Sequence, residues 1–425
     1  MRQLDVYLDG HHIGELNQTS AGATSFSYDD VYAREWNSTP LSLSMPLERT
    51  THKGKPVNAF IKGLLPDSPG RLNEIGKTFG VNPNNPVALL EHVGSDAAGA
   101  VQILPHGQES ADAAERRGDL NELDSKAFAE EIREIVRNNE TWGVRAGQGR
   151  WSLPGAQPKI ALFRGENGNW AVPNDSTPTT HILKPSVPPL SDHHINEFMT
   201  MAAAKNLGLN VADQGMIETE LGDFVYVTAR YDREIRDGKW VRLHQEDFCQ
   251  ALSVQPDKKY QEEGGPSIRN IATLFRSLPQ PEDQKSNAKG FFDALVFNVA
   301  MQGTDAHAKN YSLMLRGQSA KLAPLYDLAS HAPYTAEGLK LSMSMNDEYL
   351  IDKVGQSNFI SVAKSLGLDE TYAVERSQFI LSNTADAYDA AAREANEIVG
   401  KHPFVAKLTD SIATYAKKRG WLVTS

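Results

Sequence analysis

Residues 301–330 constrain the fold of this chain more than any other stretch of its sequence. An apolar run at residues 287–302 precedes them, and its large side chains recur at the spacing of one helix face, which predicts a buried helix. A polar loop at residues 304–310 follows, and two strand-like runs separated by a Gly-Gln turn come after it. The second run leads to Asp327. The sequence thus predicts a core helix that delivers a polar loop, followed by a hairpin that ends in a carboxylate.

The loop and the hairpin carry three oxygen-bearing side chains, Asp305, Asn310 and Asp327. Magnesium-dependent phosphoryl transfer uses such a set, in which one Asp orients the nucleophile while an Asn and a second Asp hold the metal. Hard oxygen ligands suit Mg²⁺, which binds few protein groups. Asp and Asn are also common in turns, where they bond to local backbone. The apolar helix before the loop and the carboxylate after the hairpin favour phosphotransfer over a simple turn.

Composition and charge exclude several classes of protein. A chain of 425 residues is long enough for two or three domains. Its formal net charge of -11 argues against nucleic-acid binding by overall electrostatics, so DNA contact would need a local basic patch or a basic partner. The only cysteine, Cys249, excludes an internal disulfide and a Cys-based zinc site. No apolar run is long enough to span a membrane and no signal peptide is visible, so we expect a cytoplasmic protein without a membrane partner.

The pattern of elements changes along the chain from sheet-rich to helix-rich. Residues 1–105 combine short strands and helices into one small α+β unit, beginning with a hairpin signal at Asp-Gly. Residues 106–142 contain a polar linker followed by an amphipathic helix. Residues 143–232 contain a glycine-rich loop and several strands, and residues 233–425 are mainly helical. We expect these four segments to be the domains and linker of the protein.

Local patterns also predict individual elements inside these segments. We expect a short strand at residues 41–45 and a helix at residues 245–252. Near the C-terminus, the apolar spacing predicts separate helices at residues 372–382 and 386–399.

Two features before residue 200 could contact phosphates. A Gly- and Pro-rich loop at residues 152–159 precedes a strand, and Gly155 would allow backbone N–H groups to approach a phosphate. A simple loop between strands explains this segment equally well. Lys184 ends a strand and could reach a phosphate as a point charge, although a solvated lysine is the common alternative. Glu197 on the next helix could pair with Lys184, or it could be an ordinary exposed glutamate.

Six motifs spread over nearly the whole chain are more specific together than any one alone. They are LSLSMPL at 41–47, LLPDS at 64–68, GAQPK at 155–159, PTTHILK at 178–184, TDAHAKN at 304–310 and LYD at 325–327. With these motifs the chain resembles the HipA-type serine/threonine kinases, the toxins of bacterial toxin–antitoxin pairs. The resemblance implies an α+β, bilobal, protein-kinase-like fold. Its parts would be a sheet-rich N-terminal lobe, an added small α+β unit and an all-helical C-terminal lobe.

The resemblance also implies roles for single residues in a kinase that uses ATP and Mg²⁺. Asp305 would be the catalytic base, Asn310 and Asp327 would bind Mg²⁺, and Ser152 in the phosphate loop would be autophosphorylated. A phosphate on Ser152 would add about two negative charges beside the ATP phosphates, expel the loop and switch the kinase off. The implied ATP-binding residues, with the hinge at Arg230 and Tyr231, are Ser152, Leu153, Pro154, Gly155, Ala156, Gln157, Lys184, Ala229, Arg230, Tyr231, Gln245, His307, Lys309 and Asn310.

The implied partners are a HipB-type helix-turn-helix antitoxin dimer, operator DNA bound through that complex, and a protein substrate. An aminoacyl-tRNA synthetase-like substrate would make translation the point of attack, and co-repression of the operon would explain how an acidic chain meets DNA. Two alternatives remain open, a small-molecule phosphotransferase and a non-catalytic module that holds a DNA-binding partner. The unit before residue 105 argues against the first, and the intact Asp305, Asn310 and Asp327 argue against the second.

Overall fold

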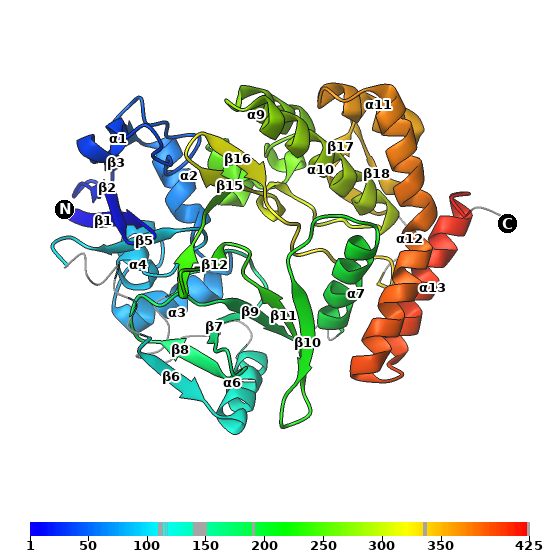
Figure 1. Cartoon of the computed structure of the whole chain (residues 1–425), viewed down its shortest axis with the longest axis horizontal. Helices are drawn as coiled ribbons and strands as arrows, with labels where there is room; N and C mark the ends of the chain where they lie inside the picture. The colour runs from blue at the N-terminus through cyan, green and yellow to red at the C-terminus, as the bar shows by residue number, and fades with distance from the viewer. Residues whose placement is uncertain are drawn as a thin grey trace. The chain divides into compact units, whose positions relative to one another are not determined.

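The computed structural model describes residues 1–108, 114, 116, 118–138, 151–188, 192–334 and 338–422. The start of the expected glycine-rich segment, residues 143–150, and parts of the expected linker lie outside these residues. The chain forms two compact units (Figure 1). Unit 1 comprises Met1–Pro185, Glu218–Asp257 and Ser312–Ala320, and unit 2 comprises Ser186–Ile217, Lys258–Tyr311 and Lys321–Ser425.

The first part of unit 1 is an antiparallel sheet with helices packed on it. Its strands follow the order β4-β3-β2-β1-β5 and are β1 (Arg2–Leu8), β2 (His11–Gln18), β3 (Thr24–Tyr28), β4 (Thr51–Lys53) and β5 (Val101–Pro105). The helices are α1 (Asp30–Arg34), α2 (Lys55–Gly63), α3 (Pro69–Phe79) and α4 (Pro86–Val93). The expected hairpin is confirmed, because Asp9, with a φ of 49°, and Gly10 turn β1 into β2.

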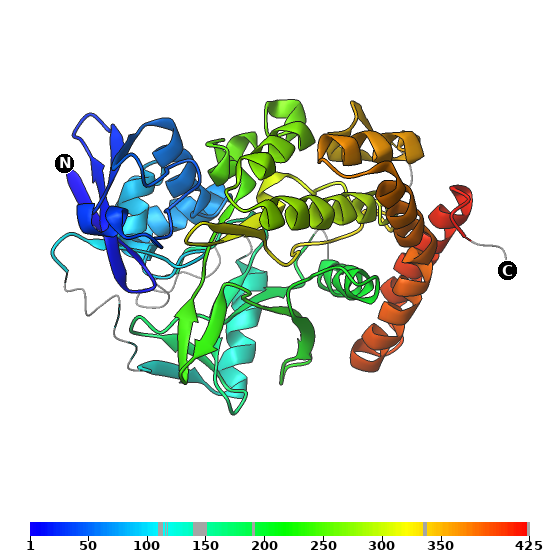
Figure 2. The same cartoon turned by 45° about the horizontal axis from the view of Figure 1, so that its top comes forward.

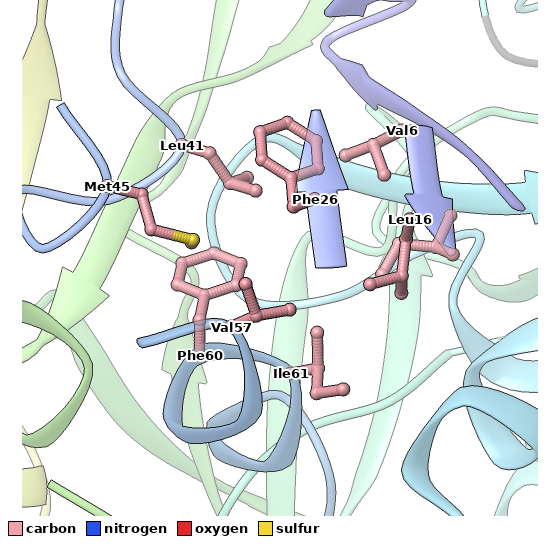
Figure 3. A pocket seen from close by; sticks show the side chains of 9 residues that line it. Val6, Leu16, Phe26, Leu41, Met45, Val57, Phe60 and Ile61 are labelled. Carbon is pink, nitrogen blue, oxygen red and sulfur yellow. The ribbon is translucent and has the colours of Figure 1, made fainter. Parts of the chain in front are cut away.

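The core of this sheet lies between its inner face and the helices. Figure 3 shows Phe26, Leu41, Met45 and Phe60 around a small apolar cavity in that core. The cavity measures about 10 Å³, and an apolar cavity of that size is too small and too dry to hold a ligand. This part of unit 1 is therefore a well-packed domain core.

A second antiparallel sheet forms the rest of unit 1. In unit 1 its strands follow the order β11-β9-β7-β8-β6 and are β6 (Leu120–Leu123), β7 (Ile160–Arg164), β8 (Trp170–Pro173), β9 (His181–Pro185) and β11 (Phe224–Ala229). Helix α6 (Ser125–Arg137) buries Phe128, which stacks on Trp170 of β8. The remaining elements of unit 1 are β12 (Arg233–Arg236), β13 (Lys239–Arg242), β14 (His244–Asp247), α8 (Phe248–Ala251), β15 (Ser312–Arg316) and β16 (Ser319–Leu322), the last of which ends in unit 2.

Unit 2 is mainly helical. It contains α7 (His193–Asn206), α9 (Ile268–Ser277), α10 (Pro281–Ala300), α11 (Gln356–Ser365), α12 (Glu370–Val399), α13 (Pro403–Lys418) and the hairpin of β17 (Lys340–Met345) and β18 (Glu348–Leu350), and β10 (Gln214–Glu218) leads from it into unit 1. Helices α12 and α13 lie side by side (Figure 2). Helix α12 also packs on α7, where the Tyr388 hydroxyl donates to the Thr200 hydroxyl at 2.9 Å. Within the described residues, no helix is long and apolar enough to cross a membrane.

The structure corrects four expectations about secondary structure. Residues 41–45 form a turn instead of a strand, because the Tyr28 hydroxyl accepts from the Leu41 N–H and donates to the Met45 carbonyl. Residues 245–252 are not one helix, since Gln245 lies on β14 and pairs with β15, about 70 residues further along the chain. The two expected C-terminal helices are the single helix α12. The expected all-helical C-terminal lobe is wrong, because β12 to β18 all lie beyond residue 232.

A buried carboxyl group fixes the turn at residues 41–45. The Glu246 side chain on β14 accepts from the Leu43 N–H at 2.7 Å and from the Ser42 hydroxyl at 2.6 Å. The residue is 1% exposed, and its burial raises the pKa of the carboxyl from 4.5 to about 8. The folded protein therefore keeps a proton on Glu246 at a pH where the unfolded chain has released it.

This difference predicts that stability falls as the pH rises. Between about pH 4.5 and 8 the unfolded state binds fewer protons than the folded state, so the free energy of unfolding decreases with pH. Glu246→Gln mimics the protonated acid and does not titrate. Between pH 5.5 and 8, the Tm of this variant should therefore fall less than the Tm of the wild type falls. The test is thermal unfolding of both proteins at several pH values. Parallel Tm curves for the two proteins would show that Glu246 does not cause the dependence.

Candidate active site

The polar loop predicted from the sequence follows directly from helix α10. Phe291, Phe292 and Val296 of α10 are fully buried, so the helix has a fixed place in unit 2. In the last turn of this helix, the side-chain amide of Asn298 donates to the Tyr311 hydroxyl at 2.6 Å. Tyr311 directly follows the loop, so this bond closes the loop at its base.

Hydrogen bonds within the loop bring its first and last polar residues together. The Asn310 side-chain amide donates to the Asp305 carbonyl at 2.8 Å. The His307 N–H donates to the same carbonyl at 2.9 Å, and the Asn310 N–H donates to the His307 carbonyl at 2.9 Å. Because the Asn310 nitrogen is used inside the loop, its amide oxygen is the atom available to a metal ion.

The Asp305 carboxylate remains open to an incoming group. Its side chain is 60% exposed, although the loop that carries it is held at both ends. The Tyr260 hydroxyl donates to its Oδ1 at 2.6 Å, and the Tyr260 ring meets the His307 ring edge to face with 5.0 Å between centroids. Tyr260 lies 45 residues before Asp305, and no motif in the sequence predicted this contact.

His307 is buried beside the Asp305 carboxylate. Burial lowers its pKa to about 4, and the opposing charges of Asp305 and Asp327 do not compensate. The imidazole is therefore neutral at pH 7. The Asp305 Oδ1 lies 3.9 Å from His307 Nε2, and the charge of Asp327 also acts on this ring.

Asp327 follows a segment that is tied to the same loop. The Tyr326 hydroxyl donates to the Lys309 carbonyl at 2.8 Å, and Leu325 pairs with Val211 in a parallel bridge. Asp327 itself is exposed and has a φ of 58°, a conformation that Asp tolerates better than most residues. Unit 2 thus gathers Asp305, Asn310 and Asp327. The Asn310 amide oxygen and the Asp327 carboxylate are hard donors that fit Mg²⁺.

The predicted phosphate loop lies in unit 1 and is attached to the N-terminal domain. Ser152 is 1% exposed, and its hydroxyl donates to the Leu64 carbonyl at 2.7 Å. The Asp67 N–H donates to the Gly155 carbonyl at 3.1 Å, and the Lys159 ammonium donates to the Pro154 carbonyl at 3.1 Å. Gly155 has a φ of 104°, which disfavours any residue with a side chain. A loop of this kind suits phosphate binding, and it also suits a plain connection.

Lys184 and Glu197 are both buried, which excludes the interpretation that they are ordinary surface residues. Lys184 on β9 is 6% exposed, and it lies opposite Tyr226 of β11 with its ammonium 5.8 Å from the ring centroid. It is therefore not a solvated strand-end lysine. Glu197 on α7 is 1% exposed, so it is not an ordinary surface glutamate. The two residues belong to different units, and their pairing stays a prediction.

The predicted hinge residues follow β11 in unit 1. Ala229 is the last residue of that strand and pairs with His181 of β9. The Tyr231 hydroxyl donates to the Gln245 amide oxygen, and the Gln245 amide nitrogen donates to Asp232 at 3.2 Å. The structure thus brings Tyr231 and Gln245 together, and their contact with a nucleotide stays a prediction.

A buried cluster of charges lies behind the hinge. Its members are Asp96, Arg230, Asp232, Arg233 and Arg242. The three arginine side chains are at most 1% exposed. Burial opposes ionisation of Asp96, but the guanidinium groups and the Thr179 hydroxyl outweigh it and hold the pKa of Asp96 well below its usual range. The sequence indicated only a loop around Asp96, because nothing local reveals three arginines that come from other segments.

Comparisons with known proteins agree with these observations. Residues 151–392 match the model of the HipA-like C-terminal domain, and residues 4–104 match the model of the HipA N-terminal domain. The putative kinase Y4mE of Sinorhizobium fredii is 33% identical over 421 residues, which cover 98% of each chain. The serine/threonine-protein kinase toxin HipA of Shewanella oneidensis is 29% identical over 384 residues, which cover 86% of this chain and 83% of that protein.

A solved structure extends the likeness to three dimensions. A chain in the complex of Shewanella oneidensis HipA, HipB and operator DNA superposes with a TM-score of 0.83 and 25% identity, covering 99% of this chain and 98% of that one. The expected kinase-like α+β fold is thereby confirmed. Both domain models, the full-length relative and the fold lead to one conclusion: this chain belongs to the HipA family of serine/threonine-protein kinase toxins.

Proposed function

We propose that this kinase transfers the γ-phosphoryl group of ATP to a serine or threonine hydroxyl with Asp305 as the base. The observation that carries the proposal is the exposed carboxylate of Asp305, which lies on a loop held by the Asn310 side chain. This carboxylate already accepts a hydrogen bond from a hydroxyl group, that of Tyr260. An acceptor hydroxyl would bind the same carboxylate and pass its proton there as the phosphoryl group arrives. The buried, neutral His307 leaves Asp305 as the basic group of the loop.

The other predicted residues bind and orient the nucleotide in this proposal. Asn310 and Asp327 hold Mg²⁺, which when bound would neutralise charge on the phosphates. Lys184 contacts the phosphates, and the loop of Ser152 to Gln157 offers them backbone N–H groups. Ala229, Arg230, Tyr231 and Gln245 frame the adenine, and His307 and Lys309 border the nucleotide from the catalytic loop. The burial of Lys184 beside the Tyr226 ring supports a specific role for that charge.

Autophosphorylation of Ser152 would act as an off switch. Its hydroxyl is buried and donates to the Leu64 carbonyl, so the loop must leave this position before the oxygen can accept phosphate. A phosphoserine has no proton to donate to that carbonyl at neutral pH and carries about two negative charges. It could not return to a site that is 1% exposed. The modified loop would therefore stay out, and the phosphate-binding position would be lost.

We further propose that the chain acts as the toxin of a toxin–antitoxin pair. Its partner would be a HipB-type antitoxin dimer, through which it reaches operator DNA as a co-repressor, and its protein substrate would be an aminoacyl-tRNA synthetase-like enzyme. The solved complex of the Shewanella oneidensis relative contains HipA, HipB and operator DNA, which supports this choice of partners. The net charge of -11 is consistent with DNA contact through a basic partner.

Asp305→Asn tests the base. The amide cannot accept a proton, so we expect phosphotransfer to fall by roughly 100-fold or more, as general-base mutants do. The Kd for Mg-ATP should stay within about twofold of the wild-type value, because no nucleotide contact depends on the lost charge. Intact mass after incubation with Mg-ATP measures the transfer, and calorimetry measures the Kd. A variant that still gains phosphate at the wild-type rate would remove Asp305 from this role.

Ser152→Ala tests the proposed self-modification. The wild type, first treated with a phosphatase, should gain the mass of one phosphate, and peptide mapping should place it on Ser152. The alanine variant should gain none, yet it should still hydrolyse ATP slowly because its base is intact. A phosphate that maps elsewhere, or an equal mass gain in the variant, would contradict the assignment.

Tyr260→Phe tests whether the tyrosine hydroxyl orients the base. Loss of the 2.6 Å bond should let the Asp305 carboxylate rotate, and we expect kcat to fall by roughly tenfold with the KM for ATP unchanged. Tyr372→Phe is the matched control, because that hydroxyl faces Asp293, another carboxylate of unit 2, at 3.4 Å. A faster Tyr260→Phe enzyme would indicate instead that the hydroxyl competes with the acceptor.

A further inference from the structure

Asp96 belongs to the N-terminal family domain but lies against the phosphate loop. It sits between α4 and β5, inside the residues that match the HipA N-terminal domain. Its carbonyl accepts from the Ser152 N–H at 3.0 Å, and it forms a parallel bridge with Trp151. The backbone of Asp96 thus holds the first residues of the loop that we assign to the ATP phosphates.

The Asp96 side chain collects donors from three other segments. Its Oδ2 accepts from the Thr179 N–H at 3.1 Å, from the Thr179 hydroxyl at 2.7 Å and from Arg230 Nη1 at 3.4 Å. Its Oδ1 accepts from Arg233 Nη2 at 2.9 Å and from Arg242 Nε at 3.1 Å. Thr179 leads into the strand that bears Lys184, and Arg230 begins the hinge. Asp96 therefore links three segments: its backbone holds the start of the phosphate loop, and its carboxylate holds the starts of the lysine strand and of the hinge.

Residues 96–99 make a second contact with the hinge, through the backbone of Gly99. The Gly99 N–H donates to Asp232 Oδ2 at 2.7 Å, and the Gln245 amide donates to the same oxygen at 3.2 Å. Gly99 has a φ of 75°, and a Cβ atom there would lie 2.8 Å from the Gln245 backbone nitrogen. Residues 96–99 are therefore fitted closely to the hinge, with no room for a side chain at position 99.

If the N-terminal domain only stabilised the kinase part of unit 1, it could be attached to any surface of that part. Here the bonds from residues 96–99 reach the segments to which we assign nucleotide contacts. We infer that Asp96 is a positioning residue for ATP binding, and that the N-terminal domain completes the nucleotide half of the kinase through it. This inference rests on the proposed function, since that proposal assigns these segments to ATP.

Thr179 offers a mild way to test the inference. Thr179→Val keeps the shape of the side chain but loses the hydroxyl, which donates to Asp96 and accepts from Arg230 Nη1 at 2.9 Å. Thr179→Ser keeps the hydroxyl. We expect the Kd of Mg²⁺ and adenylyl imidodiphosphate, measured by calorimetry on the full chain, to rise roughly tenfold in the valine variant. The serine variant should stay within about twofold of the wild type.

Asp96→Asn tests the charge itself, with Asp5→Asn as the matched control. Asp5 is a buried carboxylate of the same domain, but its partners are His106 at 2.9 Å and the Gly107 N–H at 3.2 Å. We expect Asp96→Asn to weaken nucleotide binding at least as much as Thr179→Val. Asp5→Asn should lower the Tm and leave the Kd unchanged. Thermal unfolding of each variant separates a loss of folded protein from a loss of affinity.

The outcomes separate this inference from the proposed function. If Thr179→Val binds the nucleotide as the wild type does, the inference is overturned even when the Tm falls, because the contacts are then only structural. This variant decides the matter if Asp96→Asn does not fold. Equal weakening by Asp5→Asn would also overturn it, since any damage to the domain would then have the same effect. A wild type that binds no nucleotide at all would contradict the proposed function instead.

Discussion

The interaction on which unit 1 depends is the buried cluster of Asp96 and Asp232 with three arginines. Removing guanidinium and carboxylate groups from water is costly, and the cost is offset only when every group finds a partner at short range. The cluster meets this condition, because both carboxylates accept from several donors and the arginines also donate to backbone carbonyls such as that of Ala97. Arginine suits such a position because its donors lie in a rigid, planar fork. A cluster of this kind tolerates few arrangements of the segments that contribute to it.

The catalytic loop of unit 2 is organised on a different principle. Its backbone is held by neutral hydrogen bonds, from Asn298 to Tyr311 and from Asn310 to the Asp305 carbonyl, while its reactive carboxylate stays in contact with solvent. The buried ring beside that carboxylate is the imidazole of His307, which is uncharged at neutral pH. Rigidity of the backbone and exposure of the side chain are both needed, because a base must be placed accurately and still be reached by its acceptor.

Much of the fold could be read from local patterns, and two of the errors share one cause, a partner that lies elsewhere in the chain. The hairpin at Asp9, the amphipathic helix expected within residues 106–142 and the core helix before the catalytic loop follow from turn chemistry and apolar spacing, which act over a few residues. The helix expected at residues 245–252 failed because Gln245 pairs with Met314, a partner that no local pattern reveals. The strand expected at residues 41–45 failed because the hydroxyl of Tyr28 and the carboxyl group of Glu246 hold that segment as a turn.

The sequence by itself determined the family, the kinase class and the identity of the catalytic-loop candidates, because those are carried by short motifs whose residues are adjacent in the chain. Only the tertiary structure decided which groups surround them. The contact of Tyr260 with Asp305, the burial of Ser152 under Leu64 and the arginines around Asp96 join residues 45 to 146 positions apart. Such contacts depend on how packed elements meet, and the free energy that selects them comes from burial of the whole core.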